Sequence, residues 1–282
     1  MPVAPTPAIR IGSSEIIALA DGAGPFPFTS REAAFPDATP AQWAAVDRFD
    51  PGAVDAEGRW SLNFRAFAIR GPKGITLVDA GIGPADAPAT WAPLPGKLPE
   101  SLAAAGIDPA EVDTVVLTHL HTDHIGWAVV AEEAVTTSGD GPSTGLSPFF
   151  PNAEYLIQQA EFDAVDMLNP KLRETLIDPL RASEQLRLLE GDAPLRAGRV
   201  VATPGHTPGH QSVVVADGRE SVLITGDLLV NAIQLLYPDL AYVYEIDRET
   251  ARRSREQLLR TEGGAVLHVA SSHLTEPFVP MP

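Results

Sequence analysis

Cysteine is absent from this 282-residue chain. Without thiols there is no disulfide framework, no thiolate zinc site and no cysteine nucleophile. Any metal ion that the protein binds must therefore be held by histidine and carboxylate side chains.

Long apolar runs and basic clusters are also scarce. No stretch approaches the ~20 uninterrupted apolar residues of a membrane helix. Met1–Gly12 has one arginine and three prolines and lacks the layout of a secretory signal, so we expect a cytoplasmic protein with no membrane partner. The net charge of −17 repels phosphate backbones and argues against a nucleic-acid partner. Arg252, Arg253 and Arg255 fall on a predicted amphipathic helix and are interpreted as a solvated face.

The composition is that of a globular protein with a real core, at 44% hydrophobic and 20% charged residues. The length suits one domain over residues 1–282. Within residues 1–58 we expect an irregular N-terminal arm, because Ala23 to Gly58 is rich in Pro, Asp and Ala. Ser61–Arg70 and Ile75–Asp79 flank turn residues and are predicted to form a hairpin.

Strands and helices alternate along the rest of the chain. We predict a loop over Ala134–Pro151 and helical structure at Pro99–Ala105, at Asp247–Glu262 and over most of Ala160–Leu189, broken near Pro170 and Pro179. The predicted strands are Asp113–Thr118, Ala153–Gln158, Arg199–Ala202, Gln211–Ala216, Ser221–Thr225 and Ala265–Ala270. Two groups of strands with helices after each predict a four-layer α/β sandwich, in which two sheets pack face to face with helices outside.

The segment Thr118-His119-Leu120-His121-Thr122-Asp123-His124 follows a predicted buried strand. Loops at strand ends are where rigid scaffolds present catalytic groups. Alternate residues of an extended backbone face one way, so His119 and His121 can hold one ion, and Asp123 and His124 can face a second.

Three further ligand-type residues also follow predicted strands. His206 comes after Arg199–Ala202, Asp227 after Ser221–Thr225, and His273 after Ala265–Ala270. His268, within the last of these strands, is an alternative to His273, although it is better interpreted as a residue in or near the core. His210 is interpreted as a supporting residue rather than a ligand.

The order of these motifs, with Asp79 in Leu77-Val78-Asp79-Ala80-Gly81, resembles the signature of the metallo-β-lactamase superfamily from about Arg10 to Leu274. The resemblance implies the αββα sandwich of that superfamily and a site with two metal ions. It implies that His119, His121 and His206 bind the first metal, that Asp123, His124 and His273 bind the second, and that Asp227 bridges them. Asp79 would orient the histidine loop from behind.

Within the superfamily the chain most resembles the lactonases and organophosphate hydrolases related to methyl parathion hydrolase. The similarity lies in Gly226-Asp227-Leu228-Leu229, Gln234, Tyr237-Pro238 and the predicted helix start Asp247-Arg248-Glu249-Thr250. One group of acyl-homoserine lactonases has a tyrosine three residues after the bridging aspartate, where this chain has Val230. Asp227 and the lack of cysteine argue against β-lactam hydrolysis.

The resemblance implies a hydrolase with two divalent ions that cleaves a lactone, carboxylic ester or phosphotriester with a metal-bridging hydroxide. Asp227 and Asp123 are the candidate catalytic residues, and Asp123 is also placed to move a proton to the leaving group. Nitrogen and oxygen ligands suit zinc, and manganese, iron or cobalt also fit. The expected partner is a small-molecule substrate, and a homodimer is compatible with the sequence.

Two alternative functions stay open. A glutathione-thioester hydrolase is disfavoured because only nine residues follow His273. A mono-iron persulfide dioxygenase would keep the same motifs with one metal. Six aromatic residues are candidates for lining an apolar pocket, although any single one is better interpreted as core or loop packing. They are Trp127, which is the first to inspect, Phe149, Phe150, Phe26, Phe28 and Trp60.

Overall fold

The computed structural model describes residues 6–131, 145–260 and 266–281, and its core is a pair of β-sheets. The seven-stranded sheet has the order β1-β2-β3-β4-β5-β8-β9, and the six-stranded sheet has the order β10-β11-β12-β13-β14-β15. The first comprises Ala8–Ile11, Ser14–Pro25, Ser61–Gly71, Gly74–Val78, Val112–Val116, Glu154–Gln158 and Leu186–Leu189. The second comprises Ala193–Leu195, Gly198–Ala202, Gln211–Asp217, Glu220–Ile224, Val266–Ala270 and Phe278–Pro280. The short strands β6 (Val129–Ala131) and β7 (Leu146–Pro148) pair separately.

Apolar residues on both faces of the strands form the apolar layers of the core. On β3, Phe67 and Ile69 join a core cluster with residues of the second sheet, whereas Ala66 and Ala68 join a cluster on the opposite face. Successive strand residues face opposite sides of a sheet, so both faces of the first sheet are buried. One apolar layer therefore lies between the sheets, and a further layer lies outside each of them.

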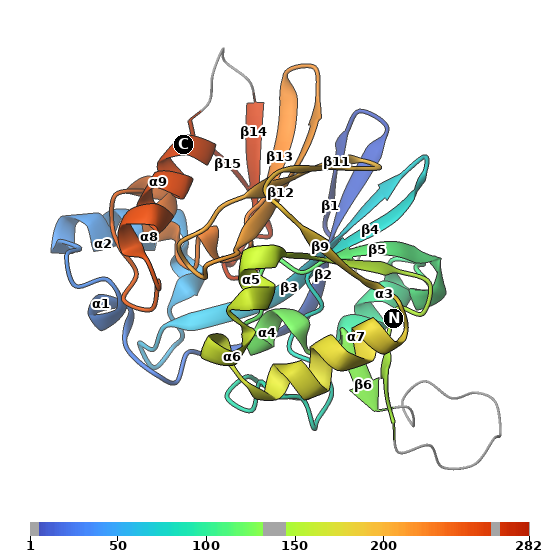
Figure 1. The fold of residues 1–282 in the computed structure, drawn as a ribbon. Helices are drawn as coiled ribbons and strands as arrows, with labels where there is room; N and C mark the ends of the chain where they lie inside the picture. The colour runs from blue at the N-terminus through green and yellow to red at the C-terminus, as the bar shows by residue number, and fades with distance from the viewer. Residues whose placement is uncertain (1–5, 132–144, 261–265, 282) are drawn as a thin grey trace.

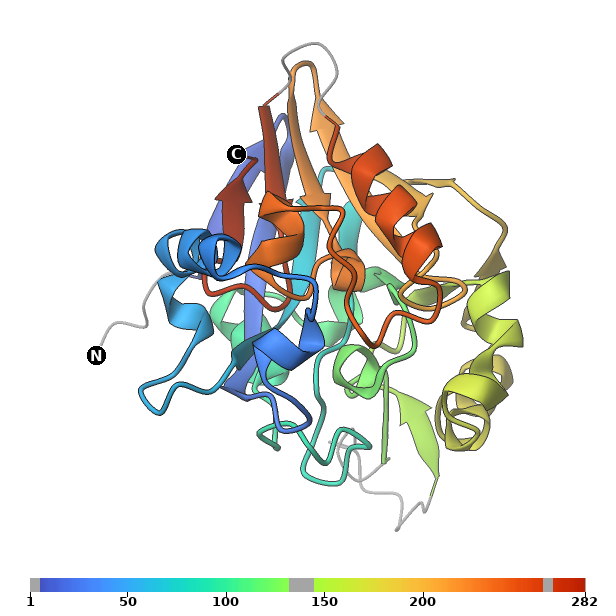
Figure 2. The same ribbon diagram turned by 90° about the vertical axis from the view of Figure 1, so that its left-hand side faces the viewer.

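Helices cover the two outer faces, as Figures 1 and 2 show. The outer face of the first sheet packs against α3 (Leu98–Ala104), the π-helical turn Arg173–Ile177 and α7 (Asp178–Ala182). The outer face of the second packs against α2 (Pro40–Phe49), α8 (Ala232–Leu236) and the end of α9 (Arg248–Leu258). The predicted four-layer αββα sandwich is confirmed.

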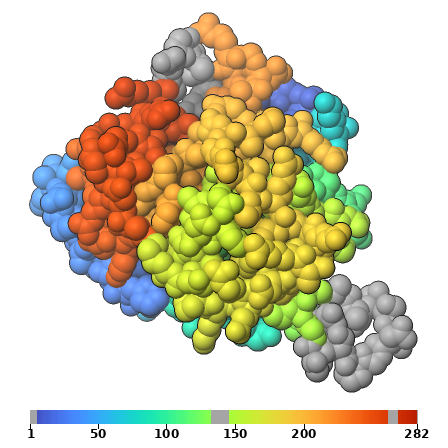
Figure 3. Space-filling view, in the orientation of Figure 1, coloured from blue at the N-terminus to red at the C-terminus, as the bar shows by residue number. Residues whose placement is uncertain are grey.

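The remaining helical segments are short. They are α1 (Arg31–Ala34), α4 (Thr122–Ile125), α5 (Gln159–Asp163), α6 (Val165–Leu168) and the 3₁₀ turns Pro51–Ala53, Pro109–Glu111 and Gly226–Leu228. In the space-filling view of Figure 3, the yellow-green and yellow segment after β8 covers much of the face beside α9. No helix in the described parts of the chain is long and apolar enough to span a membrane.

Three sequence predictions are corrected. Residues 1–58 are not an irregular arm, because they contain β1, β2, α1 and α2, and Thr39 caps α2 with a capping box. The helical prediction for 160–189 is wrong at its end, where residues 186–189 form β9. The predicted loop 134–151 contains β7, and its residues 134–144 lie outside the described residues, as do 261–265, where the predicted last helix and last strand met.

Candidate metal centre

Loops at the carboxyl ends of adjacent strands present the predicted ligands. Strands β4 and β5 are parallel neighbours, and so are β13 and β14, so the chain leaves each pair at one edge of its sheet. In α/β sheets such edges are where ligands bind. The chain reaches the His119–His124 segment after β5, Asp227 after β13 and His273 after β14, while His206 lies in the connection between β11 and β12.

Two groups of side chains could each hold a metal ion, and within each group the ligand atoms lie within 4.8 Å of one another. The first group is His119, His121, His206 and Asp227, and the second is Asp123, His124 and His273. All of these side chains are buried except His121, which is half-buried. The structure thus brings all seven predicted residues together.

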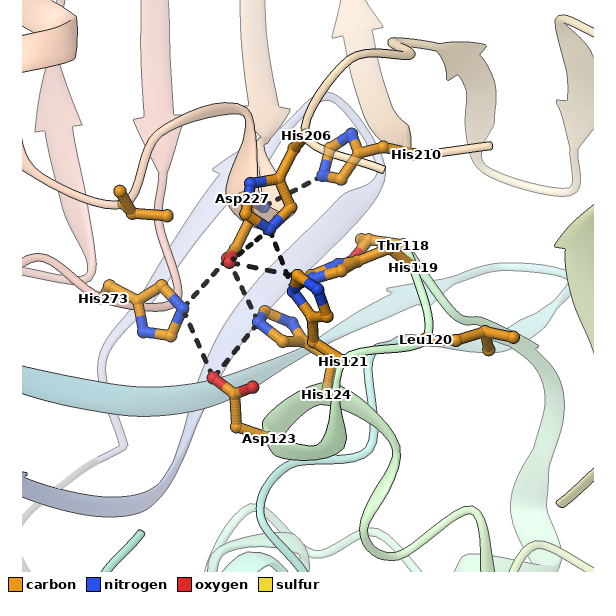
Figure 4. Close-up of polar contacts among 12 residues, drawn as sticks. Thr118, His119, Leu120, His121, Asp123, His124, His206, His210, Asp227 and His273 are labelled. Carbon is orange, nitrogen blue, oxygen red and sulfur yellow. Dashed lines mark hydrogen bonds and ion pairs between the residues drawn. The ribbon is translucent and has the colours of Figure 1, made fainter. Parts of the chain in front are cut away.

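The carboxylate of Asp227 lies between the two groups (Figure 4). Its Oδ2 is 3.2 Å from Nε2 of His206 and 3.7 Å from Nε2 of His119. Its Oδ1 is 3.1 Å from Nε2 of His124 and 2.9 Å from Nε2 of His273. One oxygen therefore faces each set of imidazoles, which is the arrangement of a bridging carboxylate.

Hydrogen bonds on the outer nitrogens of His124 and His273 leave the inner nitrogens to face the carboxylates. Nδ1 of His124 lies 2.8 Å from a carboxylate oxygen of Asp79, and Nδ1 of His273 donates to the main-chain oxygen of Asn63 at 2.8 Å. The buried atoms His124 Nε2 and Asp227 Oδ1 have no hydrogen-bond partner among the described residues. Because both are acceptors when the imidazole is neutral, a cation between them would satisfy both, and the residues present fit a metal ion.

The first group shows the same convergence of nitrogen lone pairs. Nδ1 of His121 lies 2.9 Å from Nε2 of His119 and 3.0 Å from Nε2 of His206. Neutral imidazoles carry one proton each, so three inward ring nitrogens cannot all be donors to one another. A single cation accepts all three lone pairs.

Burial and neighbouring charges set the pKa values in the site. Burial lowers the pKa of His119 well below its ordinary value and that of His121 to about 3, so both are neutral. Burial also acts to lower the pKa of His124, yet the carboxylates of Asp227, Asp123 and Asp79 raise it well above its ordinary value. Burial acts to raise the pKa of Asp227, but His124 and His273 hold it well below the usual range. Metal binding at such a site displaces protons from imidazoles.

Asp79 supports the histidine loop as predicted. Its carboxylate accepts hydrogen bonds from the backbone N–H and the hydroxyl of Thr118, in addition to its contact with His124. Its backbone adopts the left-handed region with φ of 64°, a conformation that costs free energy for a residue other than glycine. This turn places the carboxylate of Asp79 against Nδ1 of His124, on the side of the imidazole that faces away from Asp227.

Two further buried side chains hold the ligand loops. Nε2 of His210 accepts a hydrogen bond from the backbone N–H of Asp227 at 3.0 Å, which agrees with the supporting role predicted for it. The fully buried carboxylate of Glu161 accepts from the N–H of Leu120 at 2.9 Å and from the N–H of Gly209 at 2.8 Å. Glu161 therefore links the His119–His121 segment to the His206 loop, and nothing in its local sequence predicted that.

A cavity of about 450 Å³ opens over the two groups. Three aromatic residues predicted from the sequence line it, namely Phe26, Phe28 and Trp60, together with the unpredicted Trp91, Tyr242 and Tyr244. His121, Asp123, His206, Asp227 and His273 form its polar floor. All residues that line this cavity belong to the described chain, and none is a lysine or an arginine.

Trp127 and two other aromatic candidates do not line the cavity, in agreement with the core packing that the sequence favoured for each of them. Trp127, Phe149 and Phe150 pack in the core on the outer face of the first sheet. The indole N–H of Trp127 donates to the buried carboxylate of Asp21 at 3.2 Å, because the chain turns away from the cavity after α4.

The structure corrects the prediction for Arg255 and agrees with that for His268. Arg255 is fully buried, so the solvated face predicted for the three arginines is wrong at that position. His268 lies on β14 opposite Val222, outside both groups, which leaves the site to His273.

Comparison with known proteins agrees with this geometry. The model of the metallo-beta-lactamase superfamily matches residues 65–267. An N-acyl homoserine lactonase of a Bacillus species is 30% identical over 128 residues, which cover 45% of this chain and 42% of the relative. The N-acyl homoserine lactonase AttM of Agrobacterium fabrum is 29% identical over 130 residues, covering 41% of this chain and 40% of the relative. The chain thus spans less than half the length of these curated relatives.

Solved structures resemble the whole chain in fold. The hydrolase AbOPH of the beta lactamase superfamily superposes with a TM-score of 0.74 at 24% identity, covering 100% of this chain and 98% of the other. AidC, a dizinc quorum-quenching lactonase in complex with a product, superposes with a TM-score of 0.71 at 21% identity, covering 98% and 97%. At these identities the likeness shows the fold alone. The family match over residues 65–267, on a fold of four layers with two adjoining metal-ligand groups, shows that this chain belongs to the metallo-beta-lactamase superfamily.

Proposed function

We propose that this protein is a hydrolase that uses two divalent metal ions to cleave a lactone, a carboxylic ester or a phosphotriester. The observation that carries the proposal is the carboxylate of Asp227, with one oxygen toward each group of imidazoles. The curated relatives, which are N-acyl homoserine lactonases, support a carbonyl substrate.

In this proposal each ion has its own set of ligands. His119, His121 and His206 would hold the first ion with Oδ2 of Asp227, and Asp123, His124 and His273 would hold the second with Oδ1. Such nitrogen and oxygen donors suit zinc, and manganese, iron and cobalt are also compatible. Two divalent ions held by these residues would supply Lewis-acid activation of the attacked oxygen and a nucleophilic water at neutral pH.

The protein's own groups prepare the substrate and move the proton. The contacts of Asp123 with His124 and His273 use its Oδ2, at 3.5 Å and 3.7 Å, and in Figure 4 its other oxygen makes none of the drawn contacts. That Oδ1 is the group that would pass a proton to the departing oxygen. A substrate bound against the aromatic walls would displace water from the cavity, which would strengthen its electrostatic interactions with the site.

The lining of the same cavity weighs against a glutathione thioester as substrate. Glutathione carries two carboxylates, and the described cavity offers no lysine or arginine to pair with them. A mono-iron dioxygenase would keep the same ligand motifs, so the number of metal ions bound per chain is what separates it from this proposal. Neutral esters, lactones and triesters suit an apolar cavity with a polar floor.

A substrate screen tests the proposal. The zinc- or manganese-loaded protein is assayed with acyl-homoserine lactones, aryl esters, paraoxon-type triesters and a glutathione thioester, and the metal content per chain is measured. We expect about two metal ions and turnover of at least one of the first three classes. Turnover of the thioester alone, or a single iron ion in the active protein, would contradict the proposal.

Replacement of the bridging side chain tests the site itself. Asp227→Ala is expected to abolish hydrolysis and to release at least one of the two ions, because each set of imidazoles loses its shared anionic ligand. Asp192→Ala changes an exposed aspartate elsewhere and serves as the matched control. Full metal content and activity in Asp227→Ala would exclude the bridging role.

A further inference from the structure

Tyr242 places a buried phenol beside the metal-ligand groups. The residue is 5% exposed, lines the cavity, and holds its ring at 10° to the imidazole of His206 with centroids 6.2 Å apart. Its hydroxyl makes no hydrogen bond with any residue that the structure describes. Buried tyrosine hydroxyls ordinarily have a partner, so this one is directed to whatever occupies the cavity.

Tyr242 lines the same cavity as both site carboxylates, those of Asp123 and Asp227. Burial raises the pKa of Tyr242, and the charges of Asp227 and Asp123 raise it further. Both carboxylates line the cavity together with Tyr242 and with His206, whose imidazole lies parallel to the Tyr242 ring. A substrate held there would have its reacting centre within reach of the phenol.

Packing fixes the orientation of the ring. Phe35 stacks on it with centroids 5.3 Å apart at 27°, and Trp60 meets it edge-on. These ring contacts hold the Tyr242 side chain in position, so its hydroxyl is oriented before a substrate binds.

The backbone around Tyr242 is anchored as well. Its N–H donates to the buried carboxylate of Glu245 at 3.2 Å, and Glu245 is paired with the buried guanidinium of Arg255. Arg255 also donates to the main-chain oxygens of Pro238 and Leu240, at 3.1 Å each. The loop between α8 and α9 is therefore tied down at several points around the tyrosine.

We propose that Tyr242 is a catalytic residue whose hydroxyl donates a hydrogen bond to the substrate oxygen that gains negative charge during hydrolysis, on the side of His119, His121 and His206. The inference rests on the proposed function and deepens it. The hydroxyl keeps its proton throughout, so no covalent bond to the phenol forms or breaks. Donors fixed in advance toward a developing oxyanion lower the barrier because they need no reorganisation.

The neighbouring positions do not duplicate this donor. Val230 lines the same cavity with an apolar side chain. Tyr244 lies next to Tyr242, with ring centroids 5.3 Å apart, but is 47% exposed, so water competes for its hydroxyl. Of these two tyrosines, Tyr242 is therefore the one whose hydroxyl is shielded from water and held in position.

Tyr242→Phe removes the hydroxyl and keeps the ring, and Tyr237→Phe makes the same change on the same loop outside the cavity. Both variants and the wild type are loaded with zinc and checked for metal content and melting temperature. We then measure kcat and KM on the best substrate of the screen, and by calorimetry the Kd of methyl phenylphosphonate, an anionic analogue of the tetrahedral state. For Tyr242→Phe we expect kcat to fall about 100-fold with little change in KM, and Kd to rise about 10-fold.

The two readouts separate this inference from the proposed function. Phosphonate binding that depends on the Tyr242 hydroxyl, without turnover of any lactone, ester or triester, would overturn the function and support the donor. Equal Kd and kcat in Tyr242→Phe and the wild type would overturn the inference. A matching loss in Tyr237→Phe, or no phosphonate binding by the wild type, would overturn it as well.

Discussion

Replacing Arg255 with methionine would remove the positive half of a fully buried ion pair. The side chains of Arg255 and Glu245 are both 0% exposed, and Arg255 also donates to two main-chain oxygens of the loop after α8. In the variant Glu245 would keep only two donors, the amide of Gln234 at 3.1 Å and the N–H of Tyr242 at 3.2 Å. A buried carboxylate would thus lose its countercharge.

The expected cost follows from that geometry. Removing one partner of a buried pair typically destabilises a protein by about 3–5 kcal/mol, because the other charge stays buried. For a chain of this size that lowers the melting temperature by about 10 °C. The loop that carries Tyr242 and Tyr244 would lose its anchor, so catalysis should decline while the metal ligands, which lie on other loops, keep their ions.

Denaturant unfolding, the melting temperature and metal analysis measure these effects separately. Arg252→Met, on the same helix, is the control, since Arg252 is 34% exposed and its pairs with Glu249 and Glu256 lie at the surface. We expect that control to cost at most about 1 kcal/mol. If Arg255→Met costs no more than Arg252→Met, the view of Arg255 as the anchor of this loop is refuted.

Three further predictions concern the supports of the site. Asp79→Asn should weaken metal binding about 10- to 100-fold, measured by chelator competition, because an amide cannot accept from all the donors that the carboxylate serves. Glu161→Leu should destabilise the protein by about 2–6 kcal/mol in urea unfolding, since it leaves two backbone N–H groups buried without an acceptor, whereas the exposed Glu154→Leu should have little effect. Gly205→Ala should lower the melting temperature and the metal content together, because its φ is +132° and an added Cβ would lie 2.1 Å from the backbone nitrogen of Ala251. Unchanged values in any of the three would show that the contact concerned does not support the site.

Local patterns predicted the elements that matter most for the site. Ser61–Gly71, Gly74–Val78 and Val112–Val116 differ from the predicted ranges by no more than two residues at either end. Each is an apolar run bounded by turn or ligand residues, so neighbouring residues carry the signal. The N-terminal strand Ser14–Pro25 was missed because its Ala- and Gly-rich second half has no clear alternation, and its pairing with β3 is what makes it a strand.

The supports of the site were the least predictable part. Arg255 looked like its solvated neighbours, yet Ala251, one helical turn earlier, is buried on the same face of α9, and the partner Glu245 belongs to the preceding loop. Trp127 follows the histidine cluster closely, but α4 turns the chain so that its indole reaches Asp21. Tyr242 belongs to no recognisable sequence motif, so the sequence did not identify it.

The sequence by itself determined the candidate donor atoms and their order along the chain. With no cysteine, five imidazoles and two carboxylates placed after strands leave few other chemistries, because strand exits hold side chains in predictable places. Only the tertiary structure decided that Asp227 turns one oxygen to each group, that aromatic rings from both ends of the chain line the cavity, and that the Tyr242 ring lies against that of His206. These features depend on contacts between segments far apart in sequence, whose geometry is set by how the two sheets and their helices pack, and no local periodicity encodes that packing.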